Sequence, residues 1–367
     1  PAGTNGCGIK VTSTRSGDSP SAYLRISGSS KNIVIRGIEV DGQWPSVSRG
    51  GIGVSVNDHN YNRSEHAGEW RENIRIEKNF VHHVEGECLY VGPNWEYGGS
   101  VDDLRLRNVE IAENLVTDCG WDGINVKSAI EGVNVIRHNI IRRAGRAADQ
   151  SAGQHDGIAF YESGYGVIHH NLVEDSGETG ITHFLHRMPE SAGVMTSEIY
   201  NNVVVNSGVT GPSPGKGISV SRNKSAAQPR TEIYNNTIVD TEDDGIFVGS
   251  AVATSSVVRD NIVAGAQSEA VVVSGSTTAQ RNLTGKKDAM GFVDAGRRDF
   301  RLREGSPAVD SADRSGSPAD DFAGVARPQG PTPDRGAYEL IASGDPAVPA
   351  SGDPAPPKPP AFGQAAP

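Results

Sequence analysis

The chain is poor in the residues from which helical cores are built. It contains 3 Met and 3 Cys among 367 residues, only 6% of its residues are aromatic, and Leu is scarce. No long apolar segment repeats with the 3.6-residue period of an amphipathic helix. These shortages argue against a helical fold. The 45 Gly residues, together with short runs rich in Val, Ile and Asn, favour short strands joined by turns.

Two further shortages limit the partners of the protein. Basic residues are outnumbered, 34 against 45 acidic ones, and the resulting net charge of −11 argues against nucleic acid as the main partner. No apolar run reaches the length of about 18 residues that crosses a bilayer, so we expect no membrane span. The chain starts at Pro1 without a signal peptide, and we expect a trimmed form of a secreted, extracellular protein.

Two short patterns recur along the chain. The first joins Gly to β-branched or aromatic residues, as in DGINVKS at 122–128 and DGIAFY at 156–161. The second is Asn followed by two mainly apolar residues, and it starts at Asn79, Asn114, Asn139, Asn171, Asn202, Asn236, Asn261 and, more weakly, Asn282. The shortest repeat intervals are about 20–25 residues, a period that is typical of a solenoid.

The repeats predict an all-β fold, a right-handed parallel β-helix with three short strands per turn. A unit this small cannot bury its own apolar side, so neighbouring units must stack and share one long core. We expect the repeated Asn to occupy a bend in the left-handed conformation and to form a ladder of bonded amides. Cys88 and Cys119 lie about one repeat apart and match no zinc pattern. The sequence leaves open whether they are buried free thiols or a bridge.

The units DGINVKSAIEGVNVIRHNIIRRAG and DGIAFYESGYGVIHHNLVEDSG resemble repeats of secreted right-handed β-helix proteins, a group with many polysaccharide lyases. The resemblance covers about residues 20–300. Segments 320–324 and 335–339 are similar to the closing segment of bacterial β-helices, so we expect residues 1–341 to form one β-helix with both ends capped. Residues 342–367 are rich in Pro and are expected to be a tail or linker, leading to a further module or an anchor.

Insertions in the repeats indicate where the functional face lies. They flank the strands of the Gly-Ile pattern, after them at 57–72, 92–103, 185–198 and 222–231, and before them at 143–156 and 207–216. Long loops therefore border one sheet on both sides and predict a groove for an extended polysaccharide. Aromatic rings that can stack on sugars lie in these loops, at Tyr61, Trp70, Trp95, Tyr97 and Tyr165.

Strand alternation selects the residues that face this groove. With Ile124 and Val126 pointing inward, Asp122, Asn125 and Lys127 are expected to face or border solvent. The neighbouring repeats place Glu87 and Tyr90 on one side and Asp156 and Tyr161 on the other, so we expect an acidic column and a Lys127–Tyr161 pair. Later repeats add Thr182, Phe184, His186 and Arg187, followed by Lys216, Ser219, Ser221 and Arg222.

These residue types fit β-elimination on a uronic-acid polysaccharide. The reaction removes the proton α to a carboxylate and expels the 4-linked oxygen, so it needs a base and a group that neutralises the carboxylate. Lys127 or Tyr161 can act as the base, and Tyr161 or a His can protonate the leaving oxygen. Ca²⁺ or Arg and Lys side chains can neutralise the carboxylate. His155 and His186 are candidates for proton transfer or substrate contact, whereas His183 falls on the inward register.

The segment DGINVKSAIEGVNVIRHN is also similar to the segment that carries the catalytic Lys in the alginate lyase and chondroitinase B family. That resemblance implies Lys127 as the base and Asp122 as a Ca²⁺ ligand. This chain has Gly120 and Tyr161-Glu162 where the family has a second acidic ligand and an Arg-His pair, so the arginine would be Arg187 or Arg222. The candidates are, for catalysis, Lys127, Tyr161, His155 and His186; for substrate binding, Asn125, Arg187, Arg222, Lys216, Trp95 and Tyr90; and for Ca²⁺, Asp122, Asp156 and Glu87.

Other functions remain open from the sequence. A glycoside hydrolase on the same scaffold would use pairs of carboxylates, drawn from Asp122, Asp156, Glu162 and Glu87. A non-catalytic adhesin or carbohydrate-binding protein would use the same fold without chemistry. A C5-epimerase would use residues similar to those of a lyase.

Overall fold

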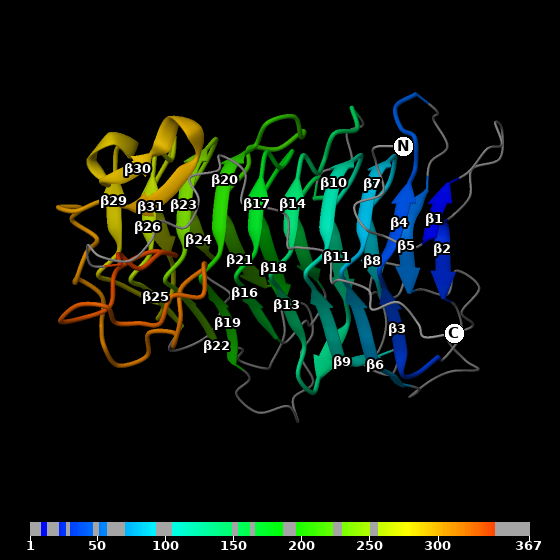
Figure 1. Ribbon diagram of the computed structural model, residues 1–367, viewed down its shortest axis with the longest axis horizontal. Coiled ribbons are helices and arrows are strands. Elements are labelled where there is room, and N and C mark those ends of the chain that lie inside the picture. The colour runs from blue at the N-terminus through cyan, green and yellow to red at the C-terminus, as the bar shows by residue number, and fades with distance from the viewer. Residues whose placement is uncertain are drawn as a thin grey trace, which may run out of the picture.

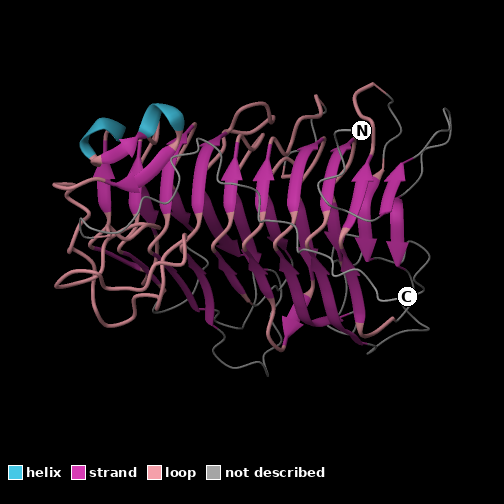
Figure 2. Ribbon diagram, viewed as in Figure 1, coloured by secondary structure: helices cyan, strands magenta, loops and turns pink. Residues whose placement is uncertain are grey.

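The protein is a stack of coils made almost entirely of parallel strands. The computed structural model describes residues 9–12, 22–26, 30–46, 51–56, 70–92, 105–148, 153–161, 166–185, 196–222, 230–249 and 256–341. Within these residues the chain passes repeatedly through sheets A, B and C in that order, and each strand pairs in parallel with its equivalent in the next coil. Figures 1 and 2 show the coils stacked along the longest axis. The predicted parallel β-helix is confirmed.

The described strands of each sheet follow the order of the coils. Sheet A consists of β1 (Ile9–Thr12), β4 (Ile38–Asp41), β7 (Phe80–Val84), β10 (Leu115–Cys119), β14 (Ile140–Arg142), β17 (Leu172–Glu174), β20 (Val203–Ser207), β23 (Thr237–Thr241), β26 (Ile262–Ala264) and β29 (Leu283–Gly285). Sheet B consists of β2 (Ala22–Ile26), β5 (Ile52–Val56), β8 (Leu89–Val91), β11 (Ile124–Lys127), β15 (Ile158–Tyr161), β18 (Ile181–Leu185), β21 (Ile218–Arg222), β24 (Ile246–Val248) and β27 (Val271–Val273).

Sheet C consists of β3 (Ile33–Arg36), β6 (Trp70–Glu77), β9 (Arg105–Ala112), β13 (Val135–Arg137), β16 (Val167–His169), β19 (Thr196–Tyr200), β22 (Arg230–Tyr234), β25 (Val257–Arg259) and β28 (Thr278–Gln280), and β12 (Ala129–Glu131) pairs with β9. An antiparallel pair follows the coils, β30 (Phe292–Asp294) and β31 (Asp299–Leu302), with two single-turn 3₁₀ helices, η2 (Lys287–Ala289) and η3 (Ala295–Arg297). None of the helices in the described residues is long and apolar enough to cross a membrane.

A continuous apolar core runs through the coils. In sheet B the inward residues are Ile or Val at most positions, and Ile124, Val126 and Ile158 are at most 1% exposed. Gly precedes these strands because there is no room for a side chain. A Cβ atom at Gly157 would lie 2.2 Å from Val173 Cγ1 and 2.6 Å from the carbonyl oxygen of Gly180 in the next coil. The recurring Gly-Ile pattern therefore marks a corner where adjacent coils leave no space for a side chain.

The predicted Asn ladder is present at the corner between sheets C and A. Each Asn from Asn79 to Asn261 donates from its side-chain amide to the side-chain oxygen of the ladder Asn in the next coil, at 2.9–3.0 Å. The left-handed backbone conformation that we expected at the ladder Asn lies one residue earlier. It occurs at the residue before the ladder Asn, as at His138 (φ 53°) and His170 (φ 55°). The ladder Asn is selected for its amide, and its predecessor makes the turn.

Cys88 and Cys119 form a disulfide with their Cα atoms 5.6 Å apart. Both are fully buried, and of the two alternatives that the sequence left open the bridge is the one observed, whereas free thiols are not. Cys119 ends β10 in sheet A and Cys88 directly precedes β8 in sheet B. The bridge therefore links two successive coils at the corner between these sheets.

The C-terminal segment packs along the side of the coils. Phe292, Phe300, Ala308 and Ala337 form a second apolar cluster with outward residues of sheet A such as Val203. Figure 1 shows the orange loops of this segment beside the coils. It contains a buried ion pair between Arg327 and Glu339, at 3.2 Å and with both side chains at most 1% exposed. The predicted closing segment thus covers a flank of the β-helix, and residues 342–367 lie outside the described residues.

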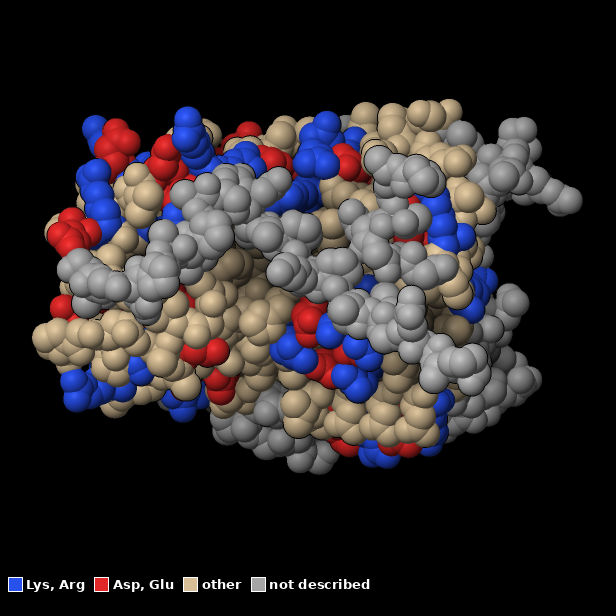
Figure 3. All heavy atoms as spheres, viewed as in Figure 1, with Lys and Arg blue, Asp and Glu red and all other residues tan. Residues whose placement is uncertain are grey.

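Sheet C carries a network of alternating charges on its outer face. Arg75 is 3.1 Å from Glu110, and Arg137 is 2.6 Å from the same carboxylate. Figure 3 shows intermixed basic and acidic side chains on the face of the molecule that carries sheets A and C. Exposed pairs of this kind contribute little to stability individually. The described side chains on this face carry charges of both signs, which does not favour binding of a charged polymer. The candidate residues lie on sheet B.

Candidate functional site

Lys127 and Tyr161 are neighbours at the ends of two paired strands. Residue by residue, β11 pairs with β15, and Lys127 lies opposite Tyr161. The next strand places Phe184 beside Tyr161, with ring centroids 6.0 Å apart. On the other side, Lys127 Nζ lies 5.5 Å from the centroid of the Tyr90 ring, a cation–π contact. The expectation that these side chains share one surface of sheet B is confirmed.

Glu87, Asp122 and Asp156 form the predicted acidic column at the start of the sheet B strands. The backbone N–H of Cys88 donates to the carbonyl of Asp122, and that of Gly123 donates to the carbonyl of Asp156, so the three acids lie in consecutive coils. The expectation that they border solvent is wrong. Their exposed fractions are 5%, 0% and 2%.

The acids are buried because their carboxylates turn along the axis of the molecule toward the next coil. Asp122 Oδ1 accepts the backbone N–H of Asp156 at 2.9 Å, and Asp156 Oδ1 accepts that of Thr179 at 2.9 Å. The series continues with the Thr179 hydroxyl oxygen, which accepts the N–H of Lys216 at 3.4 Å. These side chains make a second ladder at the corner before sheet B, and turn-forming Asp-Gly steps supply two of its rungs.

Burial makes the acidic column hard to ionise. It raises the pKa of Asp122 well above its usual range, and the charges of Asp156 and Glu87 raise it further. Burial also raises the pKa of Asp156 to about 7 and shifts that of Glu87 upward. The nearby ammonium of Lys127 partly opposes the shift of Glu87. The raised pKa values favour the protonated forms of all three carboxyls, and Glu87 interacts electrostatically with Lys127.

The remaining carboxylate oxygens are engaged by side chains. Asn125 Nδ2 donates to Asp122 Oδ2 at 2.6 Å, and the Tyr161 hydroxyl lies 3.1 Å from both Asp156 Oδ2 and the carbonyl of Gly153. Burial and the charge of Asp156 raise the pKa of Tyr161 well above its usual value. Tyr161 therefore stays protonated. This favours a role as a hydrogen-bond donor or acid over the role of base that the sequence also allowed.

The acidic column does not fit a calcium ion as arranged. Calcium takes six to eight oxygen ligands, from carboxylates, carbonyls and waters, at about 2.3–2.6 Å around one point. Both oxygens of Asp122 and of Asp156 already accept hydrogen bonds. Among the described residues, the groups of three or more side chains with metal-ligating atoms within 4.8 Å of one another do not include Glu87, Asp122 or Asp156. The calcium prediction stays a prediction.

The predicted histidines do not reach this surface in the described part of the chain. His155 is fully buried, and its carbonyl oxygen accepts the N–H of Glu178 in the next coil. His183 lies on the inward side of β18, as expected, and stacks on Phe160 with ring centroids 5.2 Å apart. His186 lies outside the described residues.

The predicted substrate-binding residues divide into three groups. Asn125 and Tyr90 lie on the outer side of sheet B, beside Lys127, but each is only 2% exposed, contrary to the expected open position. Lys216 lies two coils beyond Asp156, forms an ion pair with Asp243, and its ammonium is 5.5 Å from the centroid of the Phe247 ring. Arg222 ends β21, and its side chain is outside the described part, as are Trp95 and Arg187.

The sequence reading missed Glu178, which organises the border of sheet B. Its carboxylate accepts the backbone N–H of Gly153 at 2.7 Å and that of Ser213 at 3.2 Å. These two residues belong to the segments inserted before β15 and β21. Glu178 is 4% exposed, and its charge contributes to the raised pKa of Asp156. In the sequence, the available signal was a Glu in the turn that directly precedes the Gly180-Ile181 step.

Comparisons with known proteins agree with this architecture. No curated protein matches the chain. Among solved structures, pectate lyase Pel9A is similar with a TM-score of 0.59 and 14% identity, covering 91% of this chain and 86% of that one. The A-module of the mannuronan C-5 epimerase AlgE4 of Azotobacter vinelandii has a TM-score of 0.44 at 14% identity, covering 78% and 83%. XylC in complex with xylose has a TM-score of 0.41 at 12% identity, covering 84% and 66%.

At these identities the likeness concerns the fold, and of the three structures only the pectate lyase has a TM-score above 0.5. The assignment of the chain comes from its sequence repeats. A family model described as "Right handed beta helix region" matches residues 4–248, which is more than half of the chain. The protein belongs to this right-handed β-helix family.

Proposed function

We propose that the protein is a polysaccharide lyase that cleaves a uronic-acid-containing chain by β-elimination on the outer face of sheet B. The observation that carries the proposal is the adjacent, half-buried pair of Lys127 and Tyr161. It combines a basic group and a protonated hydroxyl on one surface. The β-helix fold shared with a pectate lyase supports a carbohydrate substrate at the coarser level.

The reaction assigns one role to each group of the pair. Lys127 Nζ, in its neutral form, takes the proton α to the uronate carboxylate. The electron pair left on that carbon forms the new C4–C5 double bond and expels the 4-linked oxygen. The pKa of Tyr161 is raised well above its usual value, so its hydroxyl is protonated before the reaction. It can then donate a hydrogen bond, or the proton itself, to the leaving oxygen. Lys216, and Arg187 or Arg222, are the candidates that neutralise the substrate carboxylate.

Burial of the acidic column favours a lyase over a hydrolase. A glycoside hydrolase needs two carboxyl groups that reach the glycosidic bond from opposite sides. Asp122 and Asp156 are 0% and 2% exposed, and their oxygens bind the protein's own groups. They are better suited to fixing the corner of sheet B, and to setting the charge around Tyr161 and Lys127, than to contacting a sugar.

Extracellular localisation is part of the same proposal. The disulfide between Cys88 and Cys119 fits an oxidising compartment, because such bridges persist mainly in secreted and surface proteins. An anionic polysaccharide outside the cell is therefore the partner that we propose, together with secretion.

The test is incubation of the protein with alginate, pectate, glycosaminoglycans, glucuronan and neutral glycans, with and without chelator. A lyase product absorbs in the ultraviolet through its new double bond. We expect absorbance to rise with one acidic polymer, the K127A variant to fold normally and lose this activity, and the control K78A to retain it. Lys78 is the same residue type at the remote corner between sheets C and A, paired with Glu113 at 3.4 Å.

Three results would overturn the assignment. New reducing ends without ultraviolet absorbance would indicate hydrolysis. Binding of a polymer without any product would indicate a carbohydrate-binding protein. Full activity of the K127A variant would remove Lys127 from the mechanism.

A further inference from the structure

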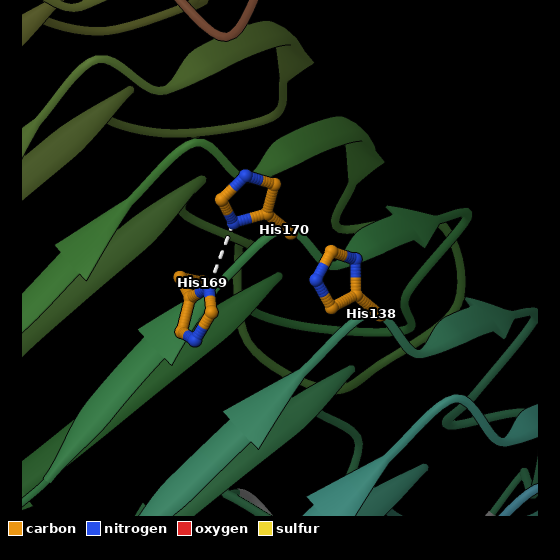
Figure 4. A group of neighbouring side chains, drawn as sticks. All are labelled: His138, His169 and His170. Atoms are coloured by element: carbon orange, nitrogen blue, oxygen red, sulfur yellow. Dashed lines mark hydrogen bonds between the residues drawn. The ribbon is translucent and has the colours of Figure 1, made fainter. Parts of the chain in front are cut away.

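Three histidines converge at the corner between sheets C and A, away from the outer face of sheet B. His169 ends β16, His170 follows it in the left-handed turn, and His138 occupies the same turn one coil earlier. Their ring nitrogens include one from each residue that all lie within 4.8 Å of one another. Figure 4 shows the three rings grouped, with His169 and His170 joined at their facing nitrogens.

We propose that His138, His169 and His170 bind a divalent transition-metal ion of the zinc class. Imidazole nitrogen is a preferred ligand of Zn²⁺, Ni²⁺ and Cu²⁺, and three histidines with an open fourth position form a recurrent zinc site. This inference does not depend on the proposed lyase activity.

The contact between His169 and His170 is a hydrogen bond that brings two potential ligand nitrogens together. The two Nδ1 atoms are 2.7 Å apart, and in the absence of an ion they share a single proton. Two nitrogens bound to tetrahedral zinc at about 2.0–2.1 Å would be about 3.3 Å apart. The two Nδ1 atoms therefore need to move apart by about 0.6 Å to bind one ion, and the His138 nitrogen, within 4.8 Å of them, has to approach.

His170 is held in the tautomer that a ligand requires. Its Nε2 lies 2.9 Å from the carbonyl oxygen of Asp321, which can only accept, so Nε2 carries the hydrogen and Nδ1 keeps a lone pair. The amide of Asn201 is 3.2 Å from the same Nε2, but it lies closer to the carbonyl of Asp320, at 2.7 Å. A backbone carbonyl behind a histidine ligand is the common support in metal sites.

The charge around the three rings does not repel a cation. The nearby guanidiniums are matched by carboxylates. Arg137 is 2.6 Å from Glu110, and Arg327 is 3.2 Å from Glu339. His138 is exposed, which gives the ion a path from solvent.

A second histidine pair, at the corner between sheets A and B, is a weaker candidate. His82 and His83 also have Nδ1 atoms 2.7 Å apart, with Asp41 nearby. There Lys10 Nζ already occupies the carboxylates, 2.8 Å from Asp41 and 2.9 Å from Glu39. A metal ion would have to displace this ammonium.

An ion at the first cluster would also fasten the C-terminal segment to the coils. His170 bonds to the Asp321 carbonyl, and Asp321 belongs to the segment that packs on the flank of the β-helix. Fixing His170 through Nδ1 fixes the ring whose Nε2 holds that segment. We therefore expect metal to raise the unfolding temperature.

The experiment titrates the chelator-treated, dialysed full chain with Zn²⁺ against a chromophoric competitor, and with Co²⁺ for its visible absorption. We expect one saturable high-affinity site and a rise in Tm of roughly 3 °C at an excess of about 100-fold over Kd. His138→Gln and His169→Gln should each weaken binding at least about tenfold, since each removes one of three ligands. His83→Gln, an exposed ring of the other pair, should leave binding unchanged.

His138 is exposed, so its variant does not depend on repacking the core and remains informative if His169→Gln unfolds. The proposal fails if the wild-type protein shows no saturable binding, which would leave the His169–His170 contact as a structural hydrogen bond. It also fails if His138→Gln binds as the wild type does, or if His83→Gln abolishes the binding.

Discussion

The interior of the Asn ladder should be the most sensitive polar element of the fold, and Asn139→Ala tests it. The Asn139 side chain is fully buried and contacts five hydrogen-bonding groups, which together amount to four hydrogen bonds because its amide has only two hydrogens to donate. Its oxygen accepts the backbone and side-chain N–H groups of Asn114, and its amide donates to Ile111, Arg137 and Asn171. At about 1 kcal/mol net for each bond, the variant should lose about 4 kcal/mol of unfolding free energy. A loss of this size is larger than most single substitutions cause.

The matched control is Asn282→Ala at the last rung of the same ladder. Asn282 makes three such bonds, to the backbone and side chain of Asn261 and to the carbonyl of Val258, and it is only partly buried. Its loss should be smaller, about 3 kcal/mol at most. Denaturant unfolding followed by Trp fluorescence measures both variants. Equal losses, or a loss below about 1 kcal/mol for Asn139→Ala, would refute the view that bonded amides hold the coils in register.

Four further predictions follow from single contacts. Tyr161→Phe removes the hydroxyl bonded to Gly153 and Asp156 and should strongly reduce turnover on the cleaved polymer, and an unchanged rate would limit Tyr161 to a stacking surface. The pKa of Asp156 is raised from 3.8 to about 7, so the folded state holds the proton more tightly and stability should fall as pH rises between these values. Asp156→Asn should flatten this fall in pH-dependent unfolding curves, and an unchanged slope would contradict the assignment. Replacing both Cys88 and Cys119 by Ala opens a link across a sequence separation of 31 and should cost about 3–4 kcal/mol, measured by denaturation with and without reductant. Arg327→Met leaves the buried Glu339 without its partner and should cost about 3–5 kcal/mol, read from Tm, whereas a Tm equal to that of the wild type would show that the ion pair is dispensable.

The register of sheet B was predictable because the sequence repeats a feature that only stacking explains. A Gly-Ile step at Gly123 and Gly157 marks the same corner in successive coils, and counting from it aligns Lys127 with Tyr161. The period-two alternation then separates inward from outward side chains.

Burial of the outward residues was not predictable in the same way. Alternation states on which side of a strand Asn125 lies, but not what covers that side. The sequence also did not show that the carboxylates of Asp122 and Asp156 bond to the backbone of the next coil. The equivalent position in the following coil is Thr179, a different residue type, so no repeated residue marks this ladder. Glu178 was missed for a related reason: its partners, Gly153 and Ser213, come from insertions of unrelated sequence.

The proximity of His138 and His170 could have been predicted from the sequence repeat. His138 and His170 each precede a ladder Asn, so the repeat already placed them in the same turn of successive coils. Reading columns along the stack, in addition to motifs along the chain, would have brought them together with His169.

The amide ladder also allows the number of coils in the molecule to vary. Between Asn236 and Asn261 the chain completes one circuit and returns to an equivalent acceptor, at the same bond length of 2.9 Å. Removing or duplicating a whole circuit there keeps the amide ladder intact, whereas the bonds of the C-terminal segment to Thr237 and Asp260 must form anew on the altered stack. The protein can become shorter or longer by complete turns while the surroundings of Lys127, several circuits away, keep their shape.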